Sequence, residues 1–289
     1  MGAKSTSFIR MRNLKYRYNS AGGYDGESPW ALNNVSLDIE KGEYVALIGA
    51  NGSGKSTLLR HMNGLLIPIN GDVWVNSLNT RDSRNIRNIR SSVGMVFQSP
   101  DAQIVATVVE EDVAFGPENL GVPRDQLKDR VNRALQQVGL ADLRKRPTHY
   151  LSAGQKQLLA IASALSMQPQ CLVLDEATAS LDPLSRSRFL ETLQALHESG
   201  ITVITATHRM EEAALATRVI ALDKGKIGLQ GTPRQVFSEQ DLLRNMKLDI
   251  PEPMKIARHV ASKVHGFRTD LLTVEEVVEN VITYRGMKG

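Results

Sequence analysis

The sequence predicts an α/β fold in which short buried strands alternate with helices. The first observation is a glycine-rich segment, residues 49–57, that follows an apolar run at residues 44–48 and precedes a stretch typical of a helix. The second is a pair of further apolar runs, residues 171–174 and 201–207, each short enough for a buried strand. The third is a segment of helical character, about residues 99–166, between two strands of the same predicted sheet.

The glycine-rich segment matches the phosphate-binding pattern G-x-x-x-x-G-K-[ST]. Its residues are Gly49, Ala50, Asn51, Gly52, Ser53, Gly54, Lys55, Ser56 and Thr57. Glycines let backbone N–H groups approach a polyphosphate, and the helix N-terminus adds unpaired donors and partial positive charge. Lys55 adds a full charge, worth about 4 kcal/mol against one phosphate charge at ~4 Å, and Ser56 offers a hydroxyl to Mg²⁺. A glycine-rich turn without a ligand is the alternative, which the agreement of strand, loop and helix disfavours.

The N-terminal part, residues 8–39, is predicted to be rich in β-structure. Apolar and polar residues alternate from Val35 to Ile39, which is typical of a half-buried strand. Residues 19–29 are rich in Gly, Ser and Tyr and predict a hairpin loop. Tyr18, just before this loop, is either an aromatic that stacks on adenine or an ordinary cross-strand aromatic, and the residues alone do not separate the two.

Beyond the phosphate-binding segment, residues 70–71 predict a turn, residues 73–75 a short strand, and residues 92–97 a strand that ends at Gln98. The helical segment that follows carries apolar residues at helical spacing and a glycine that predicts a C-cap: Leu127, Val131, Leu135, Val138 and Gly139. Ser152, Gly154 and Gln155 then precede a helix predicted at residues 156–167. These residues form either a second anion-binding surface at a helix N-terminus or a plain N-cap.

Two carboxylates follow the apolar run at residues 171–174. Asp175 and Glu176 are expected at the C-terminal edge of the sheet, where open α/β sheets bind ligands. Asp175 is suited to Mg²⁺ and Glu176 to orienting or deprotonating an attacking water. An acidic helix cap is the alternative, and the phosphate-binding segment upstream favours catalysis. His208 ends the neighbouring predicted strand, where a contact with phosphate is favoured over a structural histidine.

The C-terminal part, from residue 232, has a different character. Thr232 and Pro233 predict the start of a short helix, and residues 273–276 form a capping box. Five apolar residues then repeat on one helical face: Val274, Val277, Val278, Val281 and Ile282. This segment carries no recognisable chemistry, so an interaction or dimerisation role is the hypothesis for it.

Composition excludes several classes of protein. The net charge of +4 is mild for 289 residues and gives no reason to expect nucleic acid as a partner. The single cysteine, Cys171, excludes an internal disulfide framework and fits a reducing compartment. No stretch is long and apolar enough to span a bilayer, so we expect another chain to hold this one at any membrane on which it acts.

Six motifs in order give residues 8–231 a resemblance to the nucleotide-binding subunits of ABC transporters. They are the phosphate-binding segment, Gln98, residues 151–155, the Asp175-Glu176 pair, residues 180–182 and His208. Residues 97–105 and 110–119 are similar to the ATPases of energy-coupling factor transporters, which drive vitamin, cobalt or nickel uptake in prokaryotes.

The resemblance implies a P-loop fold with a mixed RecA-like sheet, an N-terminal antiparallel β-subdomain and a helical subdomain at about residues 99–166. An ATP-binding domain at residues 1–231 would precede a small α-rich extension at residues 232–289. ATP and Mg²⁺ are the implied ligands. Tyr18 resembles the aromatic that stacks on adenine, residues 49–57 hold the phosphates, and three residues surround Mg²⁺: Ser56, Gln98 and Asp175.

The resemblance also implies that Lys55, Glu176 and His208 carry catalysis. Ser152, Gly154 and Gln155 are implied to close over ATP bound to a second ATPase subunit in a head-to-tail dimer. A transmembrane coupling subunit and a substrate-binding membrane subunit are the other implied partners, with this chain on the cytoplasmic face of the membrane. Movement would pass through helices seated near residues 98–111.

One departure from the family is Ala153, which replaces a signature glycine. Because alanine resists positive φ, we expect one signature half-site to be altered. A soluble ABC-type ATPase and a regulatory module without turnover are the alternative functions. The former usually has long coiled-coil insertions or two fused cassettes, and neither is visible in this sequence.

Overall fold

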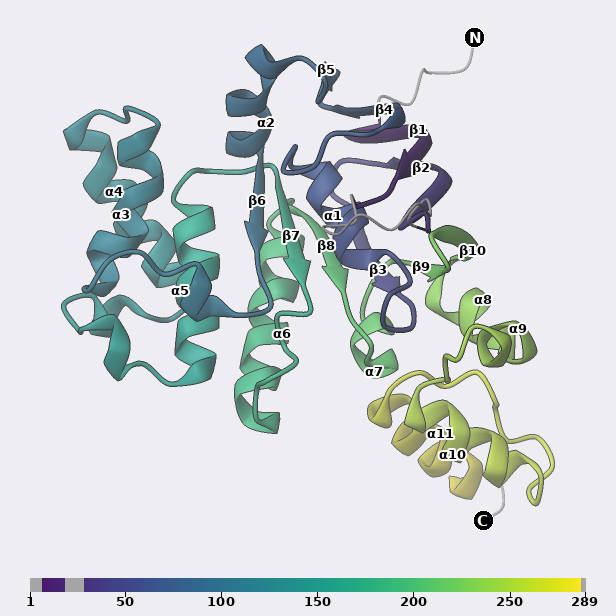
Figure 1. Cartoon of the computed structure of the whole chain (residues 1–289). Helices are drawn as coiled ribbons and strands as arrows, with labels where there is room; N and C mark the ends of the chain where they lie inside the picture. Colours follow the sequence, from purple (N-terminus) through teal and green to yellow (C-terminus); the bar gives the residue numbers. More distant parts are fainter. Residues whose placement is uncertain (1–6, 19–28, 287–289) are drawn as a thin grey trace, which may run out of the picture.

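The larger sheet of the protein positions the glycine-rich segment. The computed structural model describes residues 7–18 and 29–286, so most of the predicted loop at residues 19–29 lies outside the described residues. In the described part, six strands pair in the order β10-β9-β3-β8-β7-β6 (Figure 1). The strands are β3 (Tyr44–Ile48), β6 (Val93–Val96), β7 (Cys171–Asp175), β8 (Thr202–Ala206), β9 (Arg218–Asp223) and β10 (Lys226–Gly231). Among these pairs only β9–β10 is antiparallel, and the two strands form a hairpin around Lys224 and Gly225.

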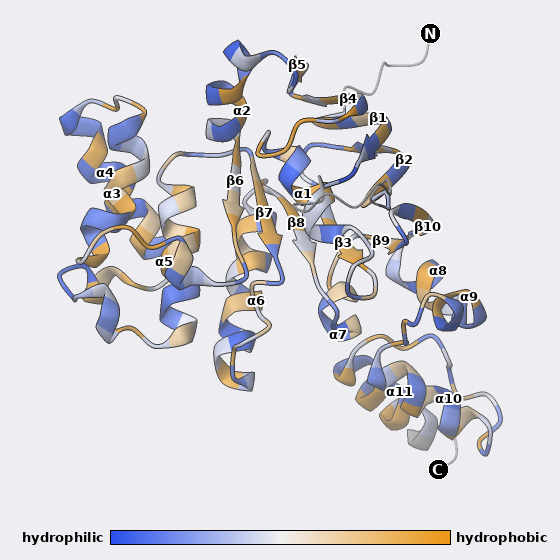
Figure 2. Cartoon of the chain, in the orientation of Figure 1, coloured by the Kyte–Doolittle hydropathy of each residue, from blue (hydrophilic) through white to orange (hydrophobic). Residues whose placement is uncertain are grey.

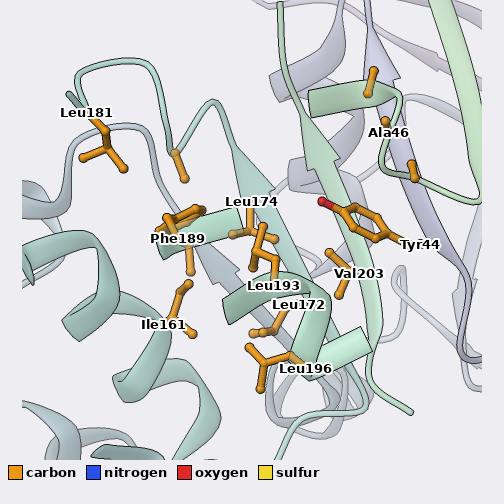
Figure 3. Close-up of a cluster of buried hydrophobic side chains, with 14 of the residues drawn as sticks. Tyr44, Ala46, Ile161, Leu172, Leu174, Leu181, Phe189, Leu193, Leu196 and Val203 are labelled. Carbon is orange, nitrogen blue, oxygen red and sulfur yellow. The ribbon is translucent and has the colours of Figure 1, made fainter. Parts of the chain in front are cut away.

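Side chains alternate between the two faces of this sheet, and both faces are buried. Tyr44, Ala46 and Ile48 belong to one apolar cluster, whereas Val45 and Leu47 belong to another. Figure 3 shows the first cluster, where Tyr44 of β3 and Phe189 of α6 lie on either side of leucines from β7 and α6. Burial on both faces explains why these strands are continuous apolar runs, and Figure 2 shows them as the most hydrophobic part of the fold.

Helices cover both faces. Helix α1 (Lys55–Met62) contributes Leu58, Leu59 and Met62 to the second cluster, together with the smaller sheet. Helices α5 (Ala153–Leu165) and α6 (Pro183–Glu198) contribute to the first cluster. Asp182 caps α6 by accepting hydrogen bonds from the backbone N–H groups of Leu184 and Ser185, as the Asp-Pro pair predicts.

The smaller sheet is antiparallel and lies beside the first. Its order is β2-β1-β4-β5, formed by β1 (Ile9–Tyr16), β2 (Leu32–Ile39), β4 (Asn70–Val75) and β5 (Leu78–Asn79). The predicted turn at residues 70–71 is wrong, because Asn70 and Gly71 begin β4 at an irregular register against β1. Gly71 has φ +78°, and a Cβ there would lie 2.3 Å from the carbonyl oxygen of Arg12. Close strand approach, rather than a chain reversal, therefore requires this glycine.

A helical layer is inserted between β6 and β7 on the far side of α5, as predicted (Figure 1). It comprises α3 (Val109–Asn119) and α4 (Arg124–Gln137), with the short α2 (Ile86–Ser92) before β6. Val131, Leu135 and Val138 are buried, and Gly139 follows α4 with φ +70°, which confirms the predicted C-cap. Helix α5 begins at Ala153 rather than at residue 156, because the Ser152 side chain caps the backbone N–H of Gln155.

Four helices form the C-terminal part: α8 (Pro233–Ser238), α9 (Gln240–Asn245), α10 (Glu252–Ala261) and α11 (Val274–Gly286). Phe237 of α8, Leu243 of α9 and Met254 of α10 join the main apolar cluster, whereas Val277 of α11 packs with α10 in a separate small cluster. Arg234 ties α8 to the start of α11 through ion pairs with Asp270 and Glu276. A short helix, α7 (Met210–Ala213), follows β8. No helix among the described residues has the length and apolar character of a bilayer span.

Candidate functional site: a phosphate-binding cavity at the sheet edge

A cavity of about 430 Å³ lies at the loop that connects β3 to α1. The larger sheet brings the C-terminal ends of β3, β7 and β8 to one edge, so residues far apart in the sequence meet there. The lining residues are Tyr18, Ala31, Asn51, Gly52, Ser53, Gly54, Lys55, Ser56, Thr57, Gln98 and Glu176. Ten of the eleven, all but Ala31, lie within the sequence-predicted site.

The loop conformation depends on its glycines. Gly54 has φ +108° and caps the N-terminus of α1, and a Cβ at this position would lie 2.6 Å from the carbonyl oxygen of Ala31. A Cβ at Gly49 would lie 2.4 Å from Ser53 Oγ. Both positions therefore admit only glycine. The backbone N–H groups of the first turn of α1 point into the cavity mouth with the positive end of the helix dipole.

Lys55 is the buried cation of the site. Its side chain is 4% exposed, and Nζ donates hydrogen bonds to the carbonyl oxygens of Gly49 (2.8 Å) and Ala50 (3.4 Å). Nζ also lies 3.4 Å from Glu176 Oε1. A buried ammonium held by a carboxylate and two carbonyls is placed to exchange these partners for phosphate oxygens.

The two carboxylates after β7 have different surroundings. Asp175 is buried, and its Oδ1 accepts a hydrogen bond from Ser56 Oγ at 2.7 Å. Burial raises the pKa of Asp175 above its ordinary value, and the Ser56 hydrogen bond partly opposes that rise. Glu176 is bent out of the strand with φ +48°, an uncommon conformation for a residue with a side chain. Its Oε2 lies 3.7 Å from Nδ1 of the half-exposed His208.

Tyr18 and Gln98 complete the cavity from two sides. The Tyr18 hydroxyl is hydrogen-bonded to Thr57 Oγ1 at 3.1 Å, and its ring packs edge-on against Tyr16 with centroids 5.1 Å apart. Tyr18 is 45% exposed and lines the cavity. Gln98 is exposed beyond β6, and its carbonyl accepts a hydrogen bond from Gln157 Nε2 at 3.0 Å.

The Ser152 segment does not line this cavity and lies at the N-terminus of α5. Ser152 and Gln155 form a capping box, in which each side chain bonds the other's backbone N–H. Gly154 packs against the start of α6, where a Cβ would lie 2.8 Å from Ser185 Cβ. Alanine was expected to alter the signature because it resists positive φ. Ala153 is the first residue of α5 and has no positive φ, so the backbone at this position does not require glycine.

A second cavity of about 600 Å³ adjoins the first and was not predicted. It shares Asn51, Gln98 and Glu176 with the first cavity and adds His208 and residues 247–249 of the C-terminal part. The backbone N–H of Glu252 donates to Glu211 Oε1 at 3.1 Å, which holds the start of α10 against α7. No sequence signal indicates this proximity, since 38 residues and five elements lie between residues 208 and 247.

A buried histidine in α1 makes the stability of this region dependent on pH. His61 Nδ1 donates to the carbonyl oxygen of Thr57 at 2.7 Å, and its ring packs edge-on against Tyr16. Burial lowers the pKa of His61 to about 4. Between about pH 6.5 and pH 4 the unfolded chain therefore binds more protons at this group than the folded chain. We expect the free energy of unfolding to fall by on the order of 3 kcal/mol across that window as the pH is lowered.

Urea unfolding of the wild type and of His61→Gln between pH 7 and pH 4 measures this contribution. Glutamine can still donate to the Thr57 carbonyl but does not titrate. The variant is expected to lose less stability than the wild type as the pH falls. Identical pH slopes for the two proteins would show that His61 does not contribute.

The loop, the helix start and the strand-end carboxylates define the chain as a P-loop nucleoside triphosphatase, and the antiparallel sheet and helical layer add the features of an ATP-binding cassette. Residues 32–179 match the sequence pattern of the family described as ABC transporter. The energy-coupling factor transporter ATP-binding protein EcfA1 of Clostridium novyi is 48% identical over 94% of this chain and 96% of its own. The chain therefore belongs to the ABC transporter family, and within it to the ATP-binding proteins of energy-coupling factor transporters.

Solved structures agree with this assignment. The structure of cbiO1 from Clostridium perfringens, described as part of the ABC transporter complex cbiONQ, superposes with a TM-score of 0.73 at 36% identity, covering 83% of this chain and 94% of its own. A dimeric ATP-binding cassette bound to ADP and Pi has a TM-score of 0.69 at 28% identity, covering 78% of this chain and 98% of its own. The resemblance stated from the motifs is thus confirmed: the chain binds ATP and couples its hydrolysis to transport.

Proposed function

We propose that this chain hydrolyses Mg²⁺-bound ATP in the cavity at the β3–α1 loop to power uptake of vitamins or transition-metal ions in a prokaryote. It would act on the cytoplasmic face of the membrane, with a transmembrane coupling subunit and a substrate-binding membrane subunit. The carrying observation is the meeting of Lys55, Asp175, Glu176 and His208 at one sheet edge. The alternatives from the sequence, a soluble ABC-type ATPase and a regulatory module, are disfavoured by the family to which the chain belongs.

The loop residues bind the triphosphate. Backbone N–H groups of residues 49–57 surround the phosphates, Lys55 Nζ pairs with the β- and γ-phosphate oxygens, and the Tyr18 ring stacks on adenine. Ser53 Oγ is buried without a hydrogen-bond partner among the described residues, which supports a ligand at this loop. Binding draws Lys55 away from Glu176 and so frees a carboxylate oxygen for the attacking water.

Ser56 and Asp175 fit a Mg²⁺ site. Their oxygens lie 2.7 Å apart, and both are ligands of the kind this ion takes, with water completing its shell. Gln98, which lines the same cavity as Ser56, would supply a further oxygen. When bound, the ion neutralises charge on the phosphates.

Glu176 and His208 carry the chemical step. The Glu176 carboxylate accepts a proton from a water molecule as the water oxygen bonds to the γ-phosphorus. The bond from that phosphorus to the bridging oxygen breaks, and ADP leaves with the electron pair. His208 Nδ1, 3.7 Å from Glu176, is placed to contact the γ-phosphate. The left-handed backbone of Glu176 directs its side chain into the cavity instead of along the strand.

A second ATPase subunit, identical or paralogous, completes each site. Ser152, Gly154 and Gln155 line neither cavity of their own chain, and Ser152 is exposed at the N-terminus of α5. We infer that these residues close over ATP held by the partner in a head-to-tail dimer, where the helix dipole favours an anion. The dimeric cassette bound to ADP and Pi supports this arrangement.

The C-terminal extension, residues 232–289, is inferred to contribute to the same dimer, beside an ATP-binding domain at residues 1–231 whose helical subdomain spans about residues 99–166. Val274, Val278 and Ile282 of α11 are each at least 50% exposed and lie on one helical face. A row of exposed apolar side chains of this kind fits a second copy of the same helix.

An apolar groove between the larger sheet and the helical layer fits a membrane partner. The groove has a volume of about 560 Å³ and is bordered by Leu65, Phe97, Val105 and Phe115, of which Val105 and Phe115 are 60% and 49% exposed. It lies beside Gln98, so an α-helix seated in it would connect the membrane subunit to the nucleotide site.

Co-purification separates the transport function from its alternatives. The Val105→Glu/Phe115→Glu double variant is expected to lose at least tenfold of the membrane subunits that co-purify with the wild type from native membranes, and to bind ATP unchanged. Leu242→Glu is the matched control, because Leu242 is 47% exposed on α9, away from the groove. Wild-type levels of co-purifying membrane protein in the double variant would exclude this groove, and absence of any membrane protein with the wild type would favour a soluble ATPase.

A further inference from the structure

Glu212 is a buried carboxylate that the proposed reaction does not use. It belongs to α7, and only 4% of its surface is exposed. The guanidinium groups of Arg186 and Arg209 lie 3.8 Å from Oε1, which provides charge near the carboxylate without a direct hydrogen bond. Burying a carboxylate costs desolvation free energy unless hydrogen bonds or charges compensate for the lost water. The groups that bind Glu212 therefore indicate its role.

Two buried hydroxyls bind this carboxylate. Thr178 Oγ1 lies 2.8 Å from Oε1 and 2.9 Å from Oε2, and Thr207 Oγ1 donates to Oε2 at 2.7 Å. Thr207 Oγ1 in turn accepts from the backbone N–H of Arg209 at 3.0 Å. We name Thr178, Thr207 and Glu212 the threonine–glutamate clamp.

Each threonine belongs to a segment that carries a catalytic side chain. Thr178 lies in the turn that begins at Glu176, closed by the bond from Ala179 N to Glu176 O at 3.1 Å. Thr207 directly precedes His208 at the end of β8. The backbone also links the two segments once, through Glu176 N and Ala206 O at 3.0 Å. The clamp therefore adds a second link between the two segments, through side chains that lie beyond this backbone hydrogen bond.

We propose that Glu212 is a positioning residue that holds Glu176 and His208 in register by clamping the turn of one to the strand end of the other. The left-handed backbone of Glu176 is an uncommon conformation that its surroundings must hold, and the clamp supplies that hold. Glu212 touches no phosphate, so its effect appears in the chemical step and not in ATP binding. The inference rests on the proposed roles of Glu176 and His208.

Isosteric substitutions test the clamp. Each variant and the wild type are purified together with the membrane subunits that co-purify with the ATPase. Thr178→Val and Thr207→Val each remove one hydroxyl and are expected to lower kcat by about 10- to 100-fold, because small misplacements of reacting groups cost factors of this size. The ATP Kd is expected to stay within about twofold of the wild type, because the loop residues 49–57 are untouched. Thr178→Ser keeps the hydroxyl and is expected to restore most of kcat.

Thr202→Val is the matched control, because Thr202 is a buried hydroxyl at the opposite end of β8, bonded to Gly42 N at 2.9 Å. It is expected to lower the melting temperature with kcat unchanged. The two clamp variants are expected to be coupled, so that Thr178→Val/Thr207→Val loses less than the product of the single losses.

A purely structural role of the clamp predicts a different pattern. The clamp variants and Thr202→Val would then lower stability alike, and kcat of the folded protein would be unchanged in all of them. That result would overturn the inference. Glu176→Gln measured beside them separates the two levels of the argument. If Glu176→Gln hydrolyses ATP normally, the proposed function fails as well. If Glu176→Gln is inactive while the clamp variants keep full kcat, only the clamp is wrong.

Discussion

Glu176→Gln is expected to bind ATP with wild-type affinity and to hydrolyse it about 10²- to 10⁴-fold more slowly, the range that a positioned general base contributes. Glutamine has the shape of glutamate but cannot accept the proton of the attacking water. In the proposed function the phosphates are bound by residues 49–57, Lys55 among them, which the substitution leaves in place. The substitution also removes the Glu176 carboxylate, which lies 3.4 Å from Lys55 Nζ and competes with phosphate for that ammonium group.

Phosphate release and equilibrium ATP binding, measured on the same preparation, check this expectation. Glu191→Gln is a suitable control, because Glu191 is an exposed carboxylate on α6 outside the two cavities that meet at Glu176. A Glu176→Gln protein that releases phosphate at the wild-type rate would remove Glu176 from the reaction. A wild type that shows no turnover even with its membrane subunits would favour the regulatory module.

Lys55→Ala is expected to weaken ATP binding by about a thousandfold and to abolish hydrolysis at ordinary ATP concentrations. The estimate follows from about 4 kcal/mol between an ammonium and one phosphate charge at ~4 Å. The buried position of Nζ excludes water that could replace it. The variant also leaves the Gly49 carbonyl and Glu176 without their cation, so a modest loss of stability accompanies the loss of binding.

The dependence on phosphate number makes this test specific. Titration with ATP, ADP and AMP should show a large loss for ATP and little change for AMP, whose single phosphate lies nearer the ribose. Lys41→Ala, in an exposed turn before β3, controls for the change in net charge. Normal ATP turnover by Lys55→Ala would contradict the proposed grip of the triphosphate.

Local patterns predicted most of the elements, because their causes are local. The runs at β3, β7 and β8 are apolar on both faces, and the structure buries both faces. The helical layer, the α4 C-cap at Gly139 and the α6 N-cap at Asp182 follow from spacing and capping chemistry. Two predictions were wrong because contacts with other residues determine the local structure. Glycine is required at Gly71 by the close approach of the Arg12 backbone and not by a turn, and α5 begins at Ala153 because Ser152 and Gln155 form a capping box.

The sequence by itself determined the phosphate loop, the residue types at the strand ends and the class of chemistry, since each depends on residues within a few positions of one another. Only the tertiary structure decided which groups meet: Lys55 with Glu176, Glu176 with His208, and the C-terminal residues 247–249 with that same edge. Strand order and helix packing set these distances between residues that lie 32 or more positions apart in the sequence, and no local propensity encodes them. The same reason hides Glu212, whose partners come from two different strand ends.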